Sequence, residues 1–135
     1  MTHSPLRVLV VEDETLIRWS IAETLTQQGH AVVEASTAAT AEEVLHDEPE
    51  PIDVVLLDLR LPDSHDLQLL ARIRRLRPES AIVMMSAYGT PELARHALEL
   101  GAYRVVDKPF DMDALAHLVR EAHNARGRLP GRGPY

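Results

Sequence analysis

Short runs of hydrophobic residues alternate along the chain with longer segments in which hydrophobic residues recur every three or four positions. The short runs are apolar at nearly every position, which is typical of strands buried on both faces of a parallel sheet. The longer segments show the period of amphipathic helices, with Ile17, Ile21 and Leu25 on one stripe of the first. The pattern predicts strands at 6–11, 31–35, 52–58, 81–86 and 103–107, and helices at 15–28, between 37 and 49, at 67–76, at 91–100 and from 111 onwards.

Alternating strands and helices predict an α/β protein with a parallel sheet covered by helices on both faces. We expect a doubly wound, flavodoxin-like sheet of five strands in order 2-1-3-4-5, with five helices. The 135 residues fit one domain, which we place at residues 5–125. Residues 126–135 include Arg126, Arg128 and Arg132 and no acid, and we expect a flexible basic tail or the start of a linker there.

Composition narrows the possible functions. The absence of cysteine rules out disulfides and thiolate metal sites and agrees with a cytoplasmic location. No apolar stretch is long enough for a membrane span, and the first residues do not resemble a signal peptide. A net charge of −7 argues against direct binding to nucleic acid or anionic membranes, and too few residues follow the last helix for a helix-turn-helix unit. The seven histidines match no metal-binding spacing, and we expect them on the surface.

Charged residues stand where three of the predicted strands end. Glu12 and Asp13 follow the first strand, Asp58 ends the third, and Lys108 follows the fifth. Ligands of open α/β sheets bind beyond the carboxyl ends of the strands, so we expect these side chains to meet at one edge. Ser86 ends the fourth strand at the same edge and would add a hydroxyl group.

Each of these residues taken alone also has a structural explanation. A single acid after a strand is most often a helix cap or a solvated loop residue, so Asp13 could simply cap the first helix. Two carboxylates about 4 Å apart, however, repel by roughly 4 kcal/mol at an effective dielectric near 20. Three of them in one crevice therefore require a cation or a proton. All the available ligands are oxygens, which predicts Mg²⁺, or Mn²⁺, over zinc. A carboxylate at such a site can accept a phosphoryl group.

Four motifs occur in order along the chain: VVEDE, VVLLDLRLPD, VMMSAYG and GAYRVVDKPF. Together they resemble the CheY-like receiver domain of bacterial two-component response regulators, over about residues 5–125. The DLRLPD loop and the SAYGTPELA stretch are most similar to receivers of the nitrogen-regulation (NtrC) type, which usually precede an ATPase domain that works with an alternative sigma factor. The resemblance implies a signalling domain that accepts a phosphoryl group from a histidine kinase or histidine phosphotransfer protein, with Mg²⁺.

The resemblance assigns roles to the charged residues at the predicted sheet edge. Asp58 matches the phosphoacceptor, and Lys108 matches the lysine that pairs with the phosphate. Asp13 matches the direct Mg²⁺ ligand, and Glu12 matches a neighbour that contacts the metal through water. Arg60 matches a position whose backbone carbonyl binds the metal, which leaves its side chain available for another role.

Residues around the expected phosphate also match the family. Ser86 matches the switch hydroxyl, Ala87 the small residue beside the phosphate, and Pro109 a proline that follows a cis peptide bond. Arg60 and Tyr88 match two positions that, in the family, tune the lifetime of the phosphate. We expect changes at either one to alter that lifetime more than they alter folding.

Two positions depart from the family's pattern. Val105 stands three residues before the lysine, where receivers usually have the Tyr or Phe that swings inward on activation. Tyr103, which we expect on the same strand face, or Tyr88 in the following loop could replace that aromatic residue, or loop closure alone could suffice. Asp66 stands where the family often has glycine, so the shape of the loop before the third helix need not follow that of the family.

The implied domain is not a metabolic enzyme, because it would catalyse only its own phosphorylation and dephosphorylation. Phosphorylation would switch the surface of the fourth helix, fifth strand and fifth helix, residues 91–125, through which many receivers form homodimers. Trp19 lies off the core stripe of the first helix, against which the kinase packs in this family. One alternative is a degenerate receiver that binds proteins without phosphorylation, which Val105 favours. Another is an aspartyl-phosphate phosphatase of the haloacid dehalogenase type, but that class needs a second acid where Arg60 stands.

Overall fold

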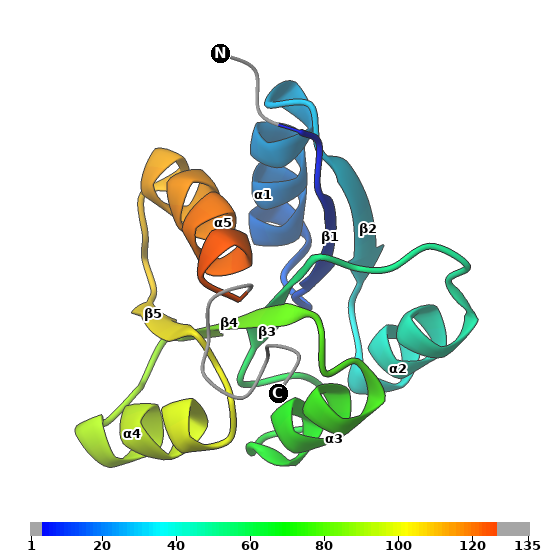
Figure 1. Ribbon diagram of the computed structural model, residues 1–135. Coiled ribbons are helices and arrows are strands. Elements are labelled where there is room, and N and C mark those ends of the chain that lie inside the picture. The colour runs from blue at the N-terminus through cyan, green and yellow to red at the C-terminus, as the bar shows by residue number, and fades with distance from the viewer. Residues whose placement is uncertain (1–3, 127–135) are drawn as a thin grey trace.

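The computed structural model describes residues 4–126, in which strands and helices alternate as the sequence predicts (Figure 1). The strands are β1 Arg7–Val11, β2 Ala31–Ala35, β3 Val54–Asp58, β4 Ala81–Ser86 and β5 Arg104–Asp107. The helices are α1 Thr15–Gln27, α2 Ala38–Asp47, α3 Gln68–Leu76, α4 Pro91–Glu99 and α5 Met112–Arg126. None of the helices in residues 4–126 is both long enough and apolar enough to cross a membrane.

All neighbouring strands of the sheet run parallel, in the order β2-β1-β3-β4-β5. The predicted doubly wound fold and its strand order are confirmed. The strand order reverses between β1 and β3, which creates the switch point where ligands of such sheets bind. The register pairs Val11 with Leu57, so the next residues, Glu12 and Asp58, come side by side where the two strands end.

Helices cover both faces of the sheet (Figure 1): α1 and α5 lie on one face, and α2, α3 and α4 lie on the other. Because successive side chains of a strand point to opposite faces, neighbouring residues enter different hydrophobic cores. Leu9 and Leu57 pack with α2, α3 and α4, whereas Val10 and Leu56 pack with α1 and α5. Each fully buried side chain of this kind contributes about 1.5–3 kcal/mol. The aliphatic cores therefore hold the ends of β1 and β3 in fixed positions.

The N-terminal edge of the sheet, where the strands begin, is tied to the helices by polar contacts. The guanidinium Nε of Arg77 donates a hydrogen bond of 2.8 Å to the carbonyl of Leu45 near the end of α2. Arg7 donates its backbone N–H to the carboxylate of Asp53 at 2.8 Å, and its guanidinium pairs with Glu48. These contacts supply partners to polar groups at the ends of β1, β3 and α2.

Two details of the sequence interpretation need correction. His30 is buried, not on the surface, and its Nδ1 accepts a 3.0 Å hydrogen bond from the backbone N–H of Leu6. Burial and the nearby charge of Arg120 lower the pKa of His30 below its usual value. In addition, α5 extends through Arg126, one residue into the expected tail, and the Arg126 guanidinium bonds to the carbonyl of Pro78. The rest of that expected tail, 127–135, lies outside the described residues.

Candidate functional site

The C-terminal edge of the sheet, where the strands end, brings the predicted carboxylates together. Glu12 and Asp13 follow β1, and Asp58 is the last residue of β3. Carboxylate oxygens of these three residues all lie within 4.8 Å of one another. Glu12 is fully buried and Asp58 nearly so, whereas Asp13 is exposed to solvent. The cluster therefore opens toward solvent on the Asp13 side.

Lys108 enters this cluster from the end of β5. Its Nζ lies 2.7 Å from Oε1 of Glu12 and 3.2 Å from Oδ2 of Asp58. Although Lys108 is close to Glu12, that buried oxygen has no hydrogen bond of acceptable angle among the described residues. One ammonium group thus faces carboxylates from two other strands, and one buried oxygen is left with its hydrogen-bonding capacity unused.

The site perturbs the ionisation of each of these groups. Burial, together with the neighbouring carboxylate of Glu12, raises the pKa of Asp58 to about 7. Burial opposes ionisation of Glu12 as well, but the adjacent ammonium of Lys108 and a hydrogen bond from the backbone N–H of Glu14 outweigh it and lower the pKa of Glu12. Burial likewise opposes the charge on Lys108, but the two carboxylates raise its pKa. Without a cation, the pair of Glu12 and Asp58 therefore favours a single negative charge.

The oxygen ligands of this cluster fit a hard divalent cation. Carboxylates, a backbone carbonyl and water are the ligands that Mg²⁺ and Mn²⁺ use in proteins. The structural alternative for Asp13, that it caps α1, is not what the structure shows. In the described chain, α1 begins after Glu14 with no side-chain hydrogen bond at its cap. Asp13 thus stands at the mouth of the cluster without serving as a helix cap.

Ser86 lies on the far side of the same edge, at the end of β4. It is buried, and its Oγ accepts a hydrogen bond of 3.3 Å from the backbone N–H of Tyr88. The carbonyl of Ser86 accepts a hydrogen bond of 2.8 Å from the backbone N–H of Lys108. The expected cis peptide bond is present between Lys108 and Pro109. Ser86, Ala87 and Lys108 are therefore held together by backbone contacts between the ends of β4 and β5.

Two exposed side chains, Arg60 and Tyr88, lie close together on the loops that follow β3 and β4. The Arg60 guanidinium lies 5.9 Å from the centre of the Tyr88 ring, within the range of a cation–π contact. The backbone N–H of Arg60 donates to Oδ1 of Asp58 at 3.3 Å, so the Arg60 backbone borders the Asp58 carboxylate. The loops after β3 and β4 thereby come together near Asp58.

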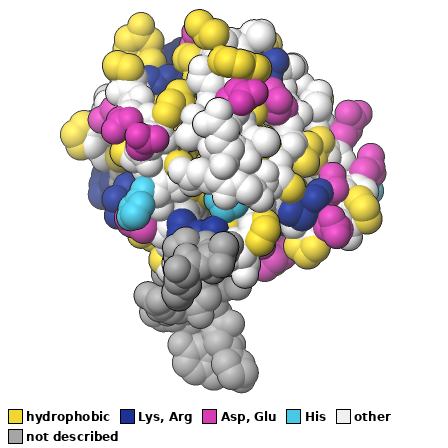
Figure 2. Space-filling model, turned by 90° about the horizontal axis from the view of Figure 1, so that it is seen from above, with side chains coloured by type: hydrophobic (Ala, Val, Ile, Leu, Met, Phe, Trp, Pro, Cys, Tyr) yellow, Lys and Arg dark blue, Asp and Glu magenta, His cyan; other side chains and the backbone are white. Residues whose placement is uncertain are grey.

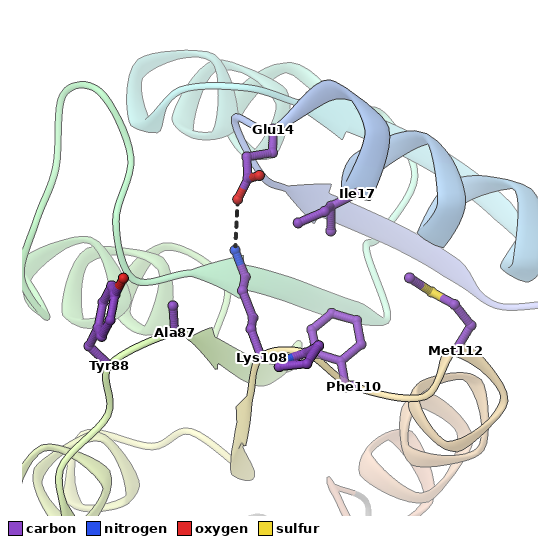
Figure 3. A pocket seen from close by; sticks show the side chains of 8 residues that line it. Glu14, Ile17, Ala87, Tyr88, Lys108, Phe110 and Met112 are labelled. Atoms are coloured by element: carbon purple, nitrogen blue, oxygen red, sulfur yellow. Dashed lines mark ion pairs between the residues drawn. The ribbon is translucent and has the colours of Figure 1, made fainter.

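A pocket of about 450 Å³ adjoins the cluster, as Figure 3 shows. Ala87 and Tyr88 line it from the loop after β4, while Phe110 lines it from the segment before α5. Glu14, on the opposite side, points toward Lys108, with 3.9 Å between Oε1 and Nζ. The sequence interpretation assigned no role to Glu14, although it is the third consecutive acid of the VVEDE motif. The pocket is mainly apolar, with its charge at the Lys108 end.

The two tyrosines considered as substitutes for the missing aromatic residue occupy different regions. Tyr88 lies beside the cluster, as described above. Tyr103 precedes β5 and packs with the core of α1 and α5, whereas Val105 packs with the core of α2, α3 and α4. The expectation that Tyr103 shares a strand face with Val105 is therefore wrong. The reason is that β5 begins only at Arg104, whose guanidinium lies 5.2 Å from the centre of the Tyr103 ring.

Comparison with known proteins identifies relatives over nearly the whole chain. Residues 8–120 match the family model of the response regulator receiver domain. The DNA-binding transcriptional regulator NtrC of Azospirillum brasilense is 34% identical over 122 residues, which are 90% of this chain and 25% of that protein. The response regulator protein FleR of Pseudomonas aeruginosa is 37% identical over 125 residues, 93% of this chain and 26% of that protein. The chain spans about a quarter of the length of these curated relatives.

Solved structures agree with the sequence relatives. The crystal structure of a CheY-like response regulator receiver domain protein from Methanospirillum hungatei matches with a TM-score of 0.84 and 29% identity. That match covers 93% of this chain and 98% of the other. The segment that matches the family model contains Glu12, Asp58 and Lys108. The chain therefore belongs to the response regulator receiver family of two-component systems, with relatives of the NtrC type.

Proposed function

We propose that this receiver accepts a phosphoryl group on Asp58 from the phosphohistidine of a histidine kinase or histidine phosphotransfer protein. The observation that carries this proposal is the convergence of Glu12, Asp13 and Asp58 within 4.8 Å, with Lys108 at 3.2 Å from Asp58. The arrangement combines a nucleophile, ligands for a divalent cation and a fixed positive charge. These are the components that phosphoryl transfer requires, because its catalysis is mainly positioning and charge neutralisation.

In the transfer, a carboxylate oxygen of Asp58 forms a bond to phosphorus as the P–N bond of phosphohistidine breaks. The electron pair of the broken bond stays on the imidazole nitrogen, which takes up a proton. Lys108 faces the acceptor carboxylate and pairs with the new anionic group. The hydroxyl of Ser86 turns from its contact with the Tyr88 N–H to donate to a phosphate oxygen. The small side chain of Ala87 leaves space beside that phosphate.

A divalent cation fits the same oxygen ligands. The residues that would hold Mg²⁺ or Mn²⁺ are Asp13 and Asp58 directly, Glu12 through water, and Arg60 through its backbone carbonyl. When bound, the ion supplies positive charge that offsets the charge of the phosphoryl oxygens. Its charge would also oppose the part of the raised pKa of Asp58 that comes from the neighbouring Glu12 carboxylate, whereas burial, the larger cause, would remain.

The phosphorylated state acts on other proteins through the surface of α4, β5 and α5, residues 91–125. This surface carries charges of both signs, including the exposed pair of Arg95 and Glu99 on α4, so a second copy of the chain could pair with it through opposite charges. Dimerisation through this surface is the expected consequence of phosphorylation. The exposed indole of Trp19 on α1 is the expected contact for the kinase.

Direct binding to nucleic acid or to a membrane is not part of the proposal. On the face that Figure 2 shows, Lys and Arg side chains stand in small groups between acidic and hydrophobic ones. The net charge of −7 opposes a polyanionic partner. We infer a cytoplasmic signalling domain whose catalysis is limited to its own phosphorylation and dephosphorylation.

One observation favours a second candidate, a receiver that binds partners without being phosphorylated. Val105 occupies the position of the usual switch aromatic residue and is partly buried against the core of α2, α3 and α4. In this alternative the acidic cluster would bind a cation, but no phosphoryl group would be retained. The phosphatase alternative has less support, because Arg60 stands where that class needs a second acid.

The first experiment is intact mass spectrometry after incubation with Mg²⁺ and acetyl phosphate. We expect one added phosphoryl group that requires the metal and is absent from Asp58→Asn. A stable beryllofluoride complex without a detectable adduct would indicate a short-lived phosphate. If Mg²⁺ binds but neither adduct nor beryllofluoride complex forms, the degenerate receiver is the correct function.

A further inference from the structure

The loop that follows the acceptor aspartate is bonded to the beginning of a different helix. Asp63, in the loop between β3 and α3, accepts a hydrogen bond of 2.7 Å from the backbone N–H of Ala38 and one of 3.0 Å from that of Ala39. Both N–H groups belong to the first turn of α2, where helical donors lack partners within the helix. These two bonds lower the pKa of Asp63. The contact joins segments 24 or more residues apart in the chain.

The same loop is fixed at two further points between Asp58 and Asp63. At its start, the backbone N–H of Arg60 donates to Oδ1 of Asp58. In its middle, Leu61 is buried and exchanges backbone hydrogen bonds of 2.7 and 3.2 Å with Ser64. Asp63 lies inside this tight turn and attaches it to α2. The Arg60 carbonyl, the proposed backbone ligand of the cation, lies on the segment between these fixed points.

We propose that Asp63 is a positioning residue for the cation site: its two bonds to α2 hold residues 59–62 in the conformation that presents the Arg60 carbonyl. This inference rests on the proposed function, because it concerns the cation that serves phosphorylation. Partners that orient metal ligands raise affinity by ordering those ligands before the ion binds. Without the Asp63 contact, the loop would have to become ordered during binding, and affinity would fall.

A simpler role for Asp63 is that it only caps α2. A carboxylate at a helix N-terminus stabilises the helix whether or not it orders anything else. The chain contains a matched control for this possibility. Thr37 caps the same helix through its own hydroxyl, which accepts a bond of 3.1 Å from the backbone N–H of Thr40. In the described chain, the side-chain bonds of Thr37 are made with Thr40, within the α2 end, and do not involve the loop after β3.

The test is a titration of the whole chain with Mn²⁺, in which the free ion is measured by electron paramagnetic resonance. Wild type, Asp63→Ala and Thr37→Ala are compared, and urea denaturation gives the stability of each. We expect both variants to lose similar stability, whereas only Asp63→Ala raises the Kd for Mn²⁺, by about tenfold. Equal Kd values for the two variants would overturn the positioning role and leave a helix cap.

A second measurement covers the case in which Asp63→Ala does not fold. Asp63→Asn keeps one acceptor oxygen, and we expect an intermediate Kd for Mn²⁺ with faster amide hydrogen exchange at Arg60. Exchange at Arg60 and Kd both equal to wild type would contradict the inference. The failure of the proposed function is distinguishable, because it would show as no Mn²⁺ binding by wild type or as binding that survives Asp13→Asn unchanged.

Discussion

Charged side chains line both edges of the sheet, but they are partnered differently. At the N-terminal edge, arginines donate to backbone carbonyls, as Arg77 does to Leu45, or pair with acids, as Arg7 does. At the C-terminal edge, carboxylates face one another and share Lys108. The first arrangement joins loops to helices, whereas the second crowds like charges and raises the pKa of Asp58 to about 7.

This difference separates the residues that stabilise the fold from those that serve the site. Polar groups that are paired with opposite charges or with backbone carbonyls stabilise the folded state, whereas crowded carboxylates reduce its stability. Removing a charge should therefore change the free energy of unfolding in opposite directions at the two edges. Four sets of substitutions test this contrast, in order of decreasing expected effect on that free energy.

The largest effect is expected for Asp58→Asn without metal. At pH 8 the substitution should raise the free energy of unfolding by about 2–4 kcal/mol, because it removes an ionised carboxylate that burial and Glu12 oppose. The folded-state pKa of Asp58, about 7, lies above its usual value of 3.8, so the folded protein binds this proton more readily than the unfolded chain. Wild type therefore gains stability relative to the variant as the pH falls below 7, and the difference should shrink at pH 5.

Urea denaturation at pH 8 and pH 5 measures this difference for Asp58→Asn. Asp13→Asn is the control, because Asp13 is exposed and its neutralisation should change stability less. If Asp58→Asn raised the free energy of unfolding equally at both pH values, the cost of an ionised Asp58 would not be the cause of the increase.

At the N-terminal edge the sign reverses. Arg77→Ala should lower the free energy of unfolding by about 2 kcal/mol, because it removes a charged hydrogen bond to the carbonyl of Leu45. The matched control is Arg95→Ala, which breaks only an exposed pair with Glu99 and should change stability by about 0.5 kcal/mol or less. Chemical denaturation supplies both values, and Mn²⁺ titration should show that neither variant alters the cation site. A stability loss for Arg77→Ala no larger than that of the control would remove the contrast between the edges.

His30 makes the N-terminal edge sensitive to pH. Because the folded-state pKa of His30 is lowered below 6.5, the unfolded chain binds this proton more readily, and stability is lost as the pH falls through 6.5. Burial and the positive charge of Arg120 lower the pKa of His30, and together they outweigh the negative charge of Asp53, which raises it. His30→Asn, whose Oδ1 can accept from the Leu6 N–H in place of Nδ1, should remove this part of the pH dependence. Denaturation of wild type and His30→Asn is compared at pH 7 and pH 5.5. An equal loss of stability in both proteins between these pH values would exclude His30 as the cause of the pH dependence.

The smallest effect on stability is expected at the rim of the C-terminal edge. Arg60 and Tyr88 are exposed, so replacing either with Ala should change the free energy of unfolding by about 0.5 kcal/mol or less. Without this contact, water should reach Asp58 more easily, and the phosphate lifetime should shorten by roughly two- to fivefold. This factor corresponds to the loss of an exposed cation–π contact, which contributes ~0.5–1 kcal/mol. Loss of label from the phosphorylated protein measures the lifetime.

A second cation–π pair provides the control for this measurement. Arg104 lies over Tyr103 at the beginning of β5, and therefore at the edge of the sheet opposite to the acidic cluster. Arg104→Ala should leave the phosphate lifetime as in wild type. A lifetime that Arg60→Ala and Arg104→Ala shorten equally would show that the effect does not depend on cover over Asp58.

The sequence by itself determined the order of the elements and the residues of the acidic cluster, whereas the strand order 2-1-3-4-5 was assumed from the doubly wound fold class and the structure confirmed it. The sequence could do so because buried parallel strands leave a continuous apolar pattern, and because the carboxyl ends of all parallel strands share one edge. Asp13, Asp58 and Lys108 follow from those two facts without any knowledge of packing. The cis peptide bond before Pro109 was also expected, from the resemblance of the KPF motif.

Only the tertiary structure decided which side chains face one another. Side chains alternate between the two faces of the sheet only within the strand, and β5 begins at Arg104. Tyr103 precedes the strand, so it packs with a different core from Val105. The hydrogen bond of buried His30 with Leu6 and the bonds of Asp63 to α2 each join residues more than twenty positions apart. A local sequence pattern carries no signal for contacts of this kind. The raised pKa of Asp58 likewise depends on the distance to Glu12 and on the exclusion of water, and both are set by packing.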